Sequence, residues 1–168
     1  MLDFLIKGGL IIDGSANPGF YGAIGVEEDT LTVLRGDVSH LKARRDLDAT
    51  GKVICPGFID VHAHSALMIL ADPKHEPKVH QGITTELIGI DGNSYAPFKS
   101  DQDLKWMIEL NSGLEGSPDL PGTWLNVSDY LAMYDNKVAV NIAYILGNSP
   151  IRIWGVGWND RPPTGTEM

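Results

Sequence analysis

The stretch VICPGFIDVHAH, residues 53–64, decides the fold. Apolar residues on both sides of Cys55-Pro56-Gly57 lead into two histidines, His62 and His64, that one alanine separates. Proline and glycine mark turns, so this pattern predicts a buried strand that begins at Phe58. Because side chains alternate along a strand, the two imidazoles are expected to point to the same face.

Two imidazoles at the end of one strand have the chemistry of a metal site. Neutral imidazole nitrogen is a standard zinc ligand at about 2.0–2.1 Å, and a strand end leaves both rings little freedom to lose. A His-x-His pair alone is a weak signal, since most such histidines lie on surfaces or in satisfied cores. The turn before the strand strengthens it, as does Asp60, which is expected on the same face and in support of the metal. The sequence therefore predicts His62 and His64 as metal ligands.

The charge balance excludes several classes of partner. The chain has 168 residues, with 13 Lys+Arg against 22 Asp+Glu and a formal net charge of −9. Nucleic acids and anionic membranes need a positive surface, so neither is expected as a partner. No apolar run approaches the roughly 18 residues of a membrane span. The single cysteine, Cys55, is interpreted as a small buried hydrophobe; with no recognisable secretory leader, it favours a cytoplasmic location.

Short apolar runs separated by turn residues predict β-structure in the first 55 residues. Four segments carry the pattern: residues 2–13, 23–26, 31–34 and 47–54. Gly8-Gly9 divides the first segment into an expected hairpin, and the second and third segments are expected to form another hairpin with a charged tip. Short strands in this number predict a small β-sandwich.

After residue 56 the pattern alternates between strands and helices, which predicts a parallel sheet of the α/β class. Strands are expected at residues 58–64, 83–90 and 137–147. One helix is expected around Pro77, and a second after Ser100, which forms a capping box with Asp103. A third helix is expected at residues 129–134, with Asn126 or Ser128 as its cap. Residues 65–71 fit a loop or a short helix, and residues 111–122 fit a loop.

The other titratable residues are weaker candidates for the site. His40, His75 and His80 stand in polar stretches and are expected to face solvent. Glu86 and Asp60 qualify as a general base by residue type only; Glu86 is interpreted as structural and Asp60 as a support of the metal site.

Several stretches resemble a known family. PGFIDVHAH resembles the first barrel strand of the amidohydrolase superfamily. The segments QGITTELIGIDGNSYAP (81–97), NIAYILGN (141–148) and RPPT (161–164) are similar to the N-acyl-D-amino-acid deacylases, also called D-aminoacylases, and the similarity extends from Asp3 over nearly the whole chain. The resemblance implies an α/β fold in two parts. Residues 1–55 would be the N-terminal part of a small β-sandwich, and residues 56–168 the first three βα units of a (β/α)8 TIM-type barrel that is incomplete in this chain.

The same resemblance implies a metal-dependent hydrolase of linear amide bonds whose substrates are small N-acyl amino acids. Zinc, as one or two divalent ions, is expected at the C-terminal mouth of the barrel, with His62, His64 and Asp91 as ligands. The deacylases usually have a cysteine at the position of Asp91. A carboxylate also binds zinc and favours harder ions, while Asp91-Gly92 fits an ordinary turn pair as well.

The family's general base, an aspartate on the last barrel strand, is expected beyond Met168, so no catalytic residue is identified in residues 1–168. Asn148-Ser149 stands where relatives often have a histidine, which leaves substrate specificity open. Two alternatives remain: a truncated, non-catalytic homologue that at most binds metal, and a cyclic-amide hydrolase of the hydantoinase or dihydroorotase kind. Three βα units expose a strand edge, so oligomer formation is also expected.

Overall fold

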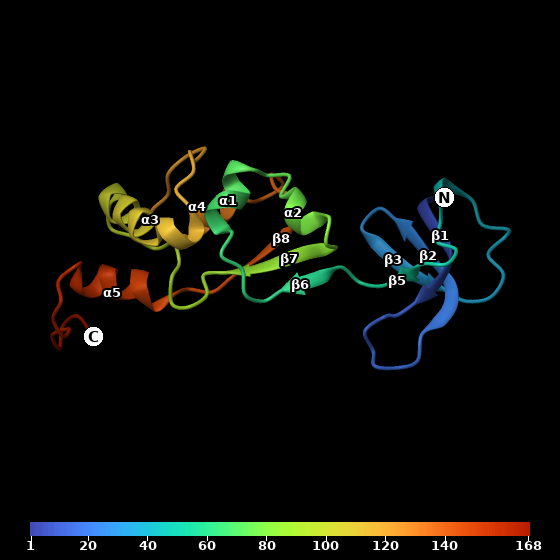
Figure 1. The fold of residues 1–168 in the computed structure, drawn as a ribbon, viewed down its shortest axis with the longest axis horizontal. Helices are drawn as coiled ribbons and strands as arrows, with labels where there is room; N and C mark the ends of the chain where they lie inside the picture. The colour runs from blue at the N-terminus through green and yellow to red at the C-terminus, as the bar shows by residue number, and fades with distance from the viewer. The chain divides into compact units, whose positions relative to one another are not determined.

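The computed structural model describes residues 1–168, which form two compact units, Met1–Pro56 and Gly57–Met168. The first unit is a single β-sheet, and the second is a parallel sheet with helices (Figure 1). None of the helices combines the length and the apolar content that a membrane span requires.

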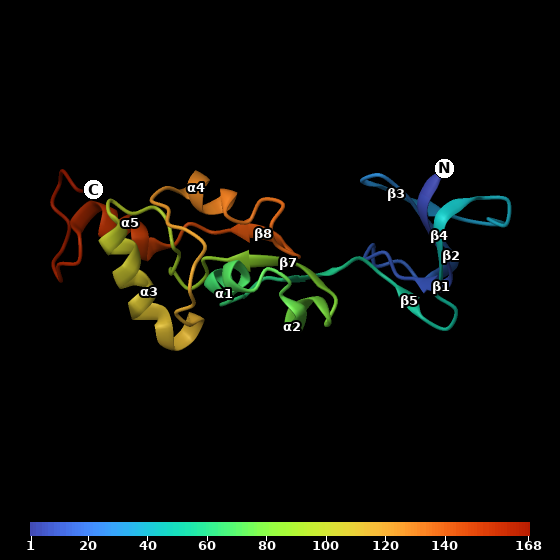
Figure 2. The same cartoon turned by 90° about the horizontal axis from the view of Figure 1, so that it is seen from above.

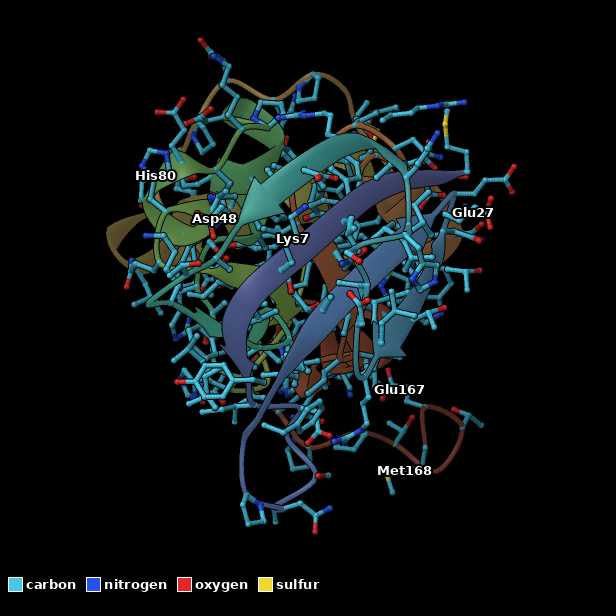
Figure 3. All side chains as sticks on the ribbon, turned by 90° about the vertical axis from the view of Figure 1, so that its right-hand side faces the viewer. Lys7, Glu27, Asp48, His80, Glu167 and Met168 are labelled. Atoms are coloured by element: carbon cyan, nitrogen blue, oxygen red, sulfur yellow. The ribbon has the colours of Figure 1, made fainter.

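The first unit is one sheet in which the strands run in the order β3-β2-β1-β4, with β5 paired to the far end of β1. Its strands are β1 (Leu2–Ile11), β2 (Phe20–Glu27), β3 (Thr30–Leu34), β4 (Ala43–Asp48) and β5 (Val53–Ile54). Figure 3 views this sheet, with Lys7 of β1 beside its register partner Asp48 of β4. A sandwich needs a second packed sheet, so the β-sandwich stays a prediction.

The predicted hairpin at Gly8-Gly9 is wrong, because β1 runs through both glycines. The register of β1 against β2 shifts between Lys7 and Leu10, which marks a β-bulge, and Gly8 has φ +84°. The chain stays extended because β4 pairs with the first part of β1 and β5 with its last two residues. The second predicted hairpin is confirmed: β2 and β3 pair antiparallel up to Glu27 and Thr30.

The second unit is a parallel sheet in the order β6-β7-β8, with helices between and after its strands. Its elements are β6 (Phe58–Asp60), α1 (Ala66–Ala71), α2 (Glu76–Val79), β7 (Ile83–Ile88), α3 (Asp101–Glu115), α4 (Val127–Ala132), β8 (Asn141–Tyr144) and α5 (Asn148–Val156). Helices α1 to α4 lie on one side of this sheet in Figure 1, and Figure 2 views them from that side.

The core of the second unit lies between the sheet and these helices. Ile88 of β7 is fully buried there, and its cross-strand partner Tyr144 packs against the same cluster. The neighbouring pair, Leu87 and Ala143, points to the other face, where Ala143 is exposed. The strand predicted at residues 137–147 is therefore confirmed over Asn141–Tyr144, where the side chains alternate between the two faces.

Local helix signals are also confirmed. Ser100 caps α3 by accepting a hydrogen bond from Asp103 N, and Asn126 rather than Ser128 caps α4. Pro77 stands in the first turn of α2, and Gly82, at φ +81°, follows that helix. Residues 66–71, which fitted a loop or a helix, are helical.

Several predicted bounds are wrong. Strand β6 ends at Asp60, before both histidines, and β8 covers only Asn141–Tyr144. Within residues 1–168, β6 pairs with β7 alone, and Phe58 and Ile59, which were predicted to be buried, are 59% and 64% exposed. Helix α5 was not predicted, although its proline, Pro150, stands in the first turn, where a helix tolerates it.

Helix α3 extends to Glu115, into the predicted loop at 111–122. Asn111 and Glu115 continue the buried side of the helix at four-residue spacing after Met107. The helix was predicted too short because these two buried residues are polar.

Gly89, just after β7, is a position that only glycine fits. Its φ is +84°, and a Cβ there would lie 2.1 Å from the carbonyl oxygen of Ile145. We expect Gly89→Ala to lower the free energy of unfolding by about 2 kcal/mol or more, measured by urea denaturation. Gly113→Ala is the matched control, because a Cβ at this α3 residue meets open space; it should be neutral or slightly stabilising. Equal stability of the Gly89→Ala variant and wild type would contradict this view of the turn.

Candidate metal centre

The structure brings together His62, His64 and Asp91. The ligand atoms of the three side chains all lie within 4.8 Å of one another, and Nε2 of each histidine is 3.3 Å from Asp91 Oδ2. The two imidazole rings meet edge to face, with centroids 5.3 Å apart. The histidines follow β6 and the aspartate follows β7, so the cluster lies where two neighbouring parallel strands end.

The three side chains fit a divalent cation. Imidazole nitrogens and a carboxylate oxygen carry lone pairs, and such atoms converge favourably only with a proton or a positive ion between them. Two histidines and one carboxylate are also a usual zinc donor set. The side chains of His62 and Asp91 are 61% and 53% exposed, whereas that of His64 is 22% exposed. Within residues 1–168 the side chains of His62 and Asp91 are therefore accessible to an ion, and that of His64 is the most enclosed of the three.

The turn after β7 carries Asp91 into the cluster. Asp91 and Gly92 have φ values of +55° and +78°, and Asn93 N donates to Ile90 O at 3.0 Å across them. Aspartate tolerates this left-handed region better than most residues. The backbone of Ser149, at the start of α5, holds the turn by donating to Gly92 O at 2.9 Å. Asp91 is thus a turn residue whose side chain also reaches the two histidines.

Asp60 does not share a face with His62 and His64 as predicted, because β6 ends at Asp60 and strand alternation does not continue to the histidines. It is the register partner of Glu86 and points toward α2, where its carboxylate accepts a hydrogen bond from Lys78 Nζ. Its other oxygen accepts from His62 N at 3.1 Å. The Lys78 ammonium group lowers the pKa of Asp60, with a smaller contribution from the His62 N–H. Asp60 therefore contacts the cluster through the backbone of His62 only.

Glu86 lies on the helix-covered side of the sheet and is fully buried. One oxygen is 2.8 Å from His75 Nε2 and 3.8 Å from Lys78 Nζ, and the other accepts from Ser65 Oγ. The prediction that His75 faces solvent is wrong, since it is buried as a partner of this carboxylate; His40 and His80 are exposed as expected. Glu86 thus has structural partners and is not among the three residues whose ligand atoms converge.

Two further findings differ from expectation. Cys55 is exposed rather than buried, because it follows β5 in the segment that leads to Gly57. Glu115, the last residue of α3, was not identified from the sequence, yet its Oε1 lies 3.3 Å from Nδ1 of His64. Its spacing from Met107 and Asn111 on one helix side was the available signal.

Comparison with known proteins shows the family to which the chain belongs. A model of the amidohydrolase family matches residues 46–159, and the chain belongs to this family. Within it, the D-aminoacylase of Alcaligenes xylosoxydans xylosoxydans is 36% identical over 151 residues, which cover 89% of this chain and 30% of the relative. The N-acyl-D-aspartate deacylase of the same organism is 34% identical over 166 residues, which cover 98% and 32%. The resemblance to the deacylases is confirmed, and the chain spans about a third of the length of these curated relatives.

The chain is also similar in structure to solved deacylases. A D-aminoacylase structure concerned with its binuclear metal centre matches with a TM-score of 0.81 at 34% identity, covering 99% of this chain and 34% of that one. The N-acyl-D-glutamate deacylase of Bordetella bronchiseptica, bound to zinc and a phosphonate mimic of the tetrahedral intermediate, matches at 0.80 and 32%, with the same coverage. An L-hydantoinase from Arthrobacter aurescens matches at 0.55 and 18%, covering 90% and 30%, which shows the shared fold alone.

Proposed function

We propose that residues 1–168 supply the N-terminal third of a metal-dependent hydrolase that cleaves the linear amide bond of N-acylated D-amino acids. The observation that carries this proposal is the convergence of His62, His64 and Asp91 at the ends of β6 and β7 in a member of the amidohydrolase family. The names of the related deacylases support the substrate class. In this proposal, residues 56–168 are the first three βα units of a (β/α)8 barrel, and residues 1–55 are part of a β-sandwich.

We propose zinc, as one or two ions, for the metal. His62 and His64 would bind it through Nε2 and Asp91 through a carboxylate oxygen, while Asp60 would support the site through the His62 backbone. A zinc ion held there acts as a Lewis acid on the amide carbonyl and supplies a nucleophile at neutral pH. The general base is expected outside residues 1–168.

Asp91→Asn separates the turn role of Asp91 from its role as a ligand. Asparagine also tolerates a positive φ, so the turn and the stability of the chain should persist. The amide is a much weaker zinc ligand than a carboxylate, so we expect zinc affinity to fall by about 10-fold or more, measured by competition with a chromogenic chelator. Unchanged affinity in a folded Asp91→Asn variant would leave Asp91 as a turn residue only.

The activity is tested with the longest natural protein that contains residues 1–168. It should hydrolyse N-acetyl-D-amino acids in preference to the L-enantiomers when loaded with zinc. Ring opening of a hydantoin without deacylation would favour the cyclic-amide alternative. Zinc binding with no hydrolysis of either substrate would favour the non-catalytic homologue. A cytoplasmic location also belongs to this proposal; its support is the single cysteine, which leaves no internal disulfide.

Residues 1–168 produced alone are expected to self-associate. Ile59 and Val61, on and just after the edge strand β6, are 64% and 65% exposed, and exposed apolar strand edges promote association. Light scattering during size-exclusion chromatography should show dimers or larger species, and Ile59→Lys should shift them toward monomer. Leu110→Lys, at an exposed residue of α3, is the control and should change nothing. A wild-type chain that stays monomeric at high concentration would contradict this expectation.

A further inference from the structure

Helix α3 places a buried carboxylate against the better-buried metal ligand. Glu115 is the last residue of this helix, its side chain is 4% exposed, and its Oε1 lies 3.3 Å from His64 Nδ1. Its other oxygen, Oε2, has no hydrogen-bond partner, and neither has the buried hydroxyl of Tyr95.

Stability alone does not account for an acidic residue at this position. The C-terminal end of a helix carries partial negative charge, which disfavours a carboxylate in the last turn. A buried oxygen without a partner is a further cost. Earlier positions on the same buried side hold Leu104 and Met107, which have neither cost. Glu115 faces two polar groups that a leucine or methionine could not bond. One is His64 Nδ1, 3.3 Å from Oε1. The other is the Tyr95 hydroxyl, whose pKa is raised by burial and further by the Glu115 carboxylate.

The contact between Glu115 and His64 affects which nitrogen of His64 is free. A neutral imidazole carries its hydrogen on one nitrogen and a lone pair on the other. Carboxylate oxygens, which can only accept, lie 3.3 Å from both nitrogens of His64: Glu115 Oε1 from Nδ1 and Asp91 Oδ2 from Nε2. With a metal ion between Nε2 and Asp91, the hydrogen of the neutral ring stands on Nδ1, where Glu115 accepts it. The lone pair is then on Nε2, the atom that faces Asp91 in the cluster.

We propose that Glu115 is a positioning residue for His64: it selects the tautomer with hydrogen on Nδ1 and holds the ring so that Nε2 faces the metal ion. This inference rests on the proposed metal role of His64. Glu115 itself does not bind the ion. Partners that fix the second nitrogen of a metal-binding histidine are a general means of raising metal affinity.

The test separates a positioning role from a structural one, because the two predict different changes. Glu115→Met removes the acid and the unpartnered oxygen but keeps an unbranched side chain of similar length, so the chain should remain folded, with an unfolding midpoint equal to or above that of wild type. Its zinc affinity, measured by competition with a chelator, should fall by about 10- to 100-fold. Glu115→Gln, closer in shape, should show a smaller fall in the same direction. Glu109→Gln, at an exposed residue of the same helix, is the control and should bind zinc as wild type does.

A spectroscopic readout accompanies the affinities. Long-range 1H–15N correlation spectra of zinc-loaded wild type should show the His64 hydrogen on Nδ1 and the metal on Nε2. Wild-type zinc affinity in both folded Glu115 variants, or a wild-type hydrogen on Nε2, would overturn the proposal. His64→Ala separates the positioning role of Glu115 from the metal role of His64. If His64→Ala lowers zinc affinity while the Glu115 variants do not, only the positioning role fails. If it has no effect, the metal site fails as well. Neither result depends on substrate hydrolysis.

Discussion

Replacing both His62 and His64 with alanine is expected to remove zinc from the protein. These residues supply two of the three ligand atoms in the cluster. Loss of a partner behind a ligand typically costs about 10- to 100-fold in affinity, so loss of two ligands should cost more than about 100-fold. Zinc content after equilibration in a metal buffer, measured by mass spectrometry, should fall from at least one ion per chain to nearly none.

The fold should survive this change, because the His62 side chain is 61% exposed and that of His64 partly so. The circular dichroism of the double variant should match that of wild type, which separates loss of metal from unfolding. The matched control replaces His40 and His80, two exposed histidines outside the cluster, and should keep its zinc. Zinc content that is the same in both double variants would remove His62 and His64 as ligands.

Glu86→Ala is expected to destabilise the second unit by about 3 kcal/mol or more. The fully buried carboxylate has three partners, His75, Ser65 and Lys78, and breaking a buried charged pair by removing one member costs about 3–5 kcal/mol. All four tryptophans lie in residues 57–168, so their fluorescence during urea denaturation reports on this unit alone. Glu86→Gln keeps the size and part of the hydrogen bonding and should cost less.

The control for Glu86→Ala is Glu109→Ala, which removes an exposed carboxylate from α3 and should change the free energy of unfolding by less than about 0.5 kcal/mol. Indistinguishable urea midpoints for Glu86→Ala and Glu109→Ala would mean that the buried network contributes nothing to stability. The network also borders the metal cluster, since Ser65 follows His64 and Lys78 bonds Asp60. Zinc affinity is therefore expected to fall together with stability.

Features with a local cause were predictable from the sequence. The caps of α3 and α4, the proline of α2 and the hairpin of β2 and β3 each depend on residues a few positions apart. The pair His62 and His64 was found for the same reason, because one short segment carries both rings and the turn before them. Asp91 was predicted as a ligand through the family resemblance alone. Its local sequence, Asp91-Gly92, fits an ordinary turn equally well and does not indicate a position beside the histidines.

Features that depend on distant partners were not predictable. Strand β1 passes through Gly8-Gly9 because β4 and β5, about 40 residues later, hold both of its parts. Strand β6 ends at Asp60, where its pairing with β7 ends, although its apolar sequence suggested a longer strand. Glu115 lies 51 positions from His64, and His75 is buried only because Glu86 meets it from the sheet. Contacts of this kind follow from the packing of elements. The four-residue spacing of Met107, Asn111 and Glu115 indicates a buried helix side but not which residue Glu115 meets there.

The most direct test of the metal centre is anomalous diffraction at the zinc edge from crystals of the zinc-loaded protein. We expect an anomalous peak about 2.0–2.2 Å from Nε2 of His62, Nε2 of His64 and one carboxylate oxygen of Asp91. A peak bound elsewhere, or two histidine rings that point away from each other into dry packing with no ion between them, would contradict the proposed metal site.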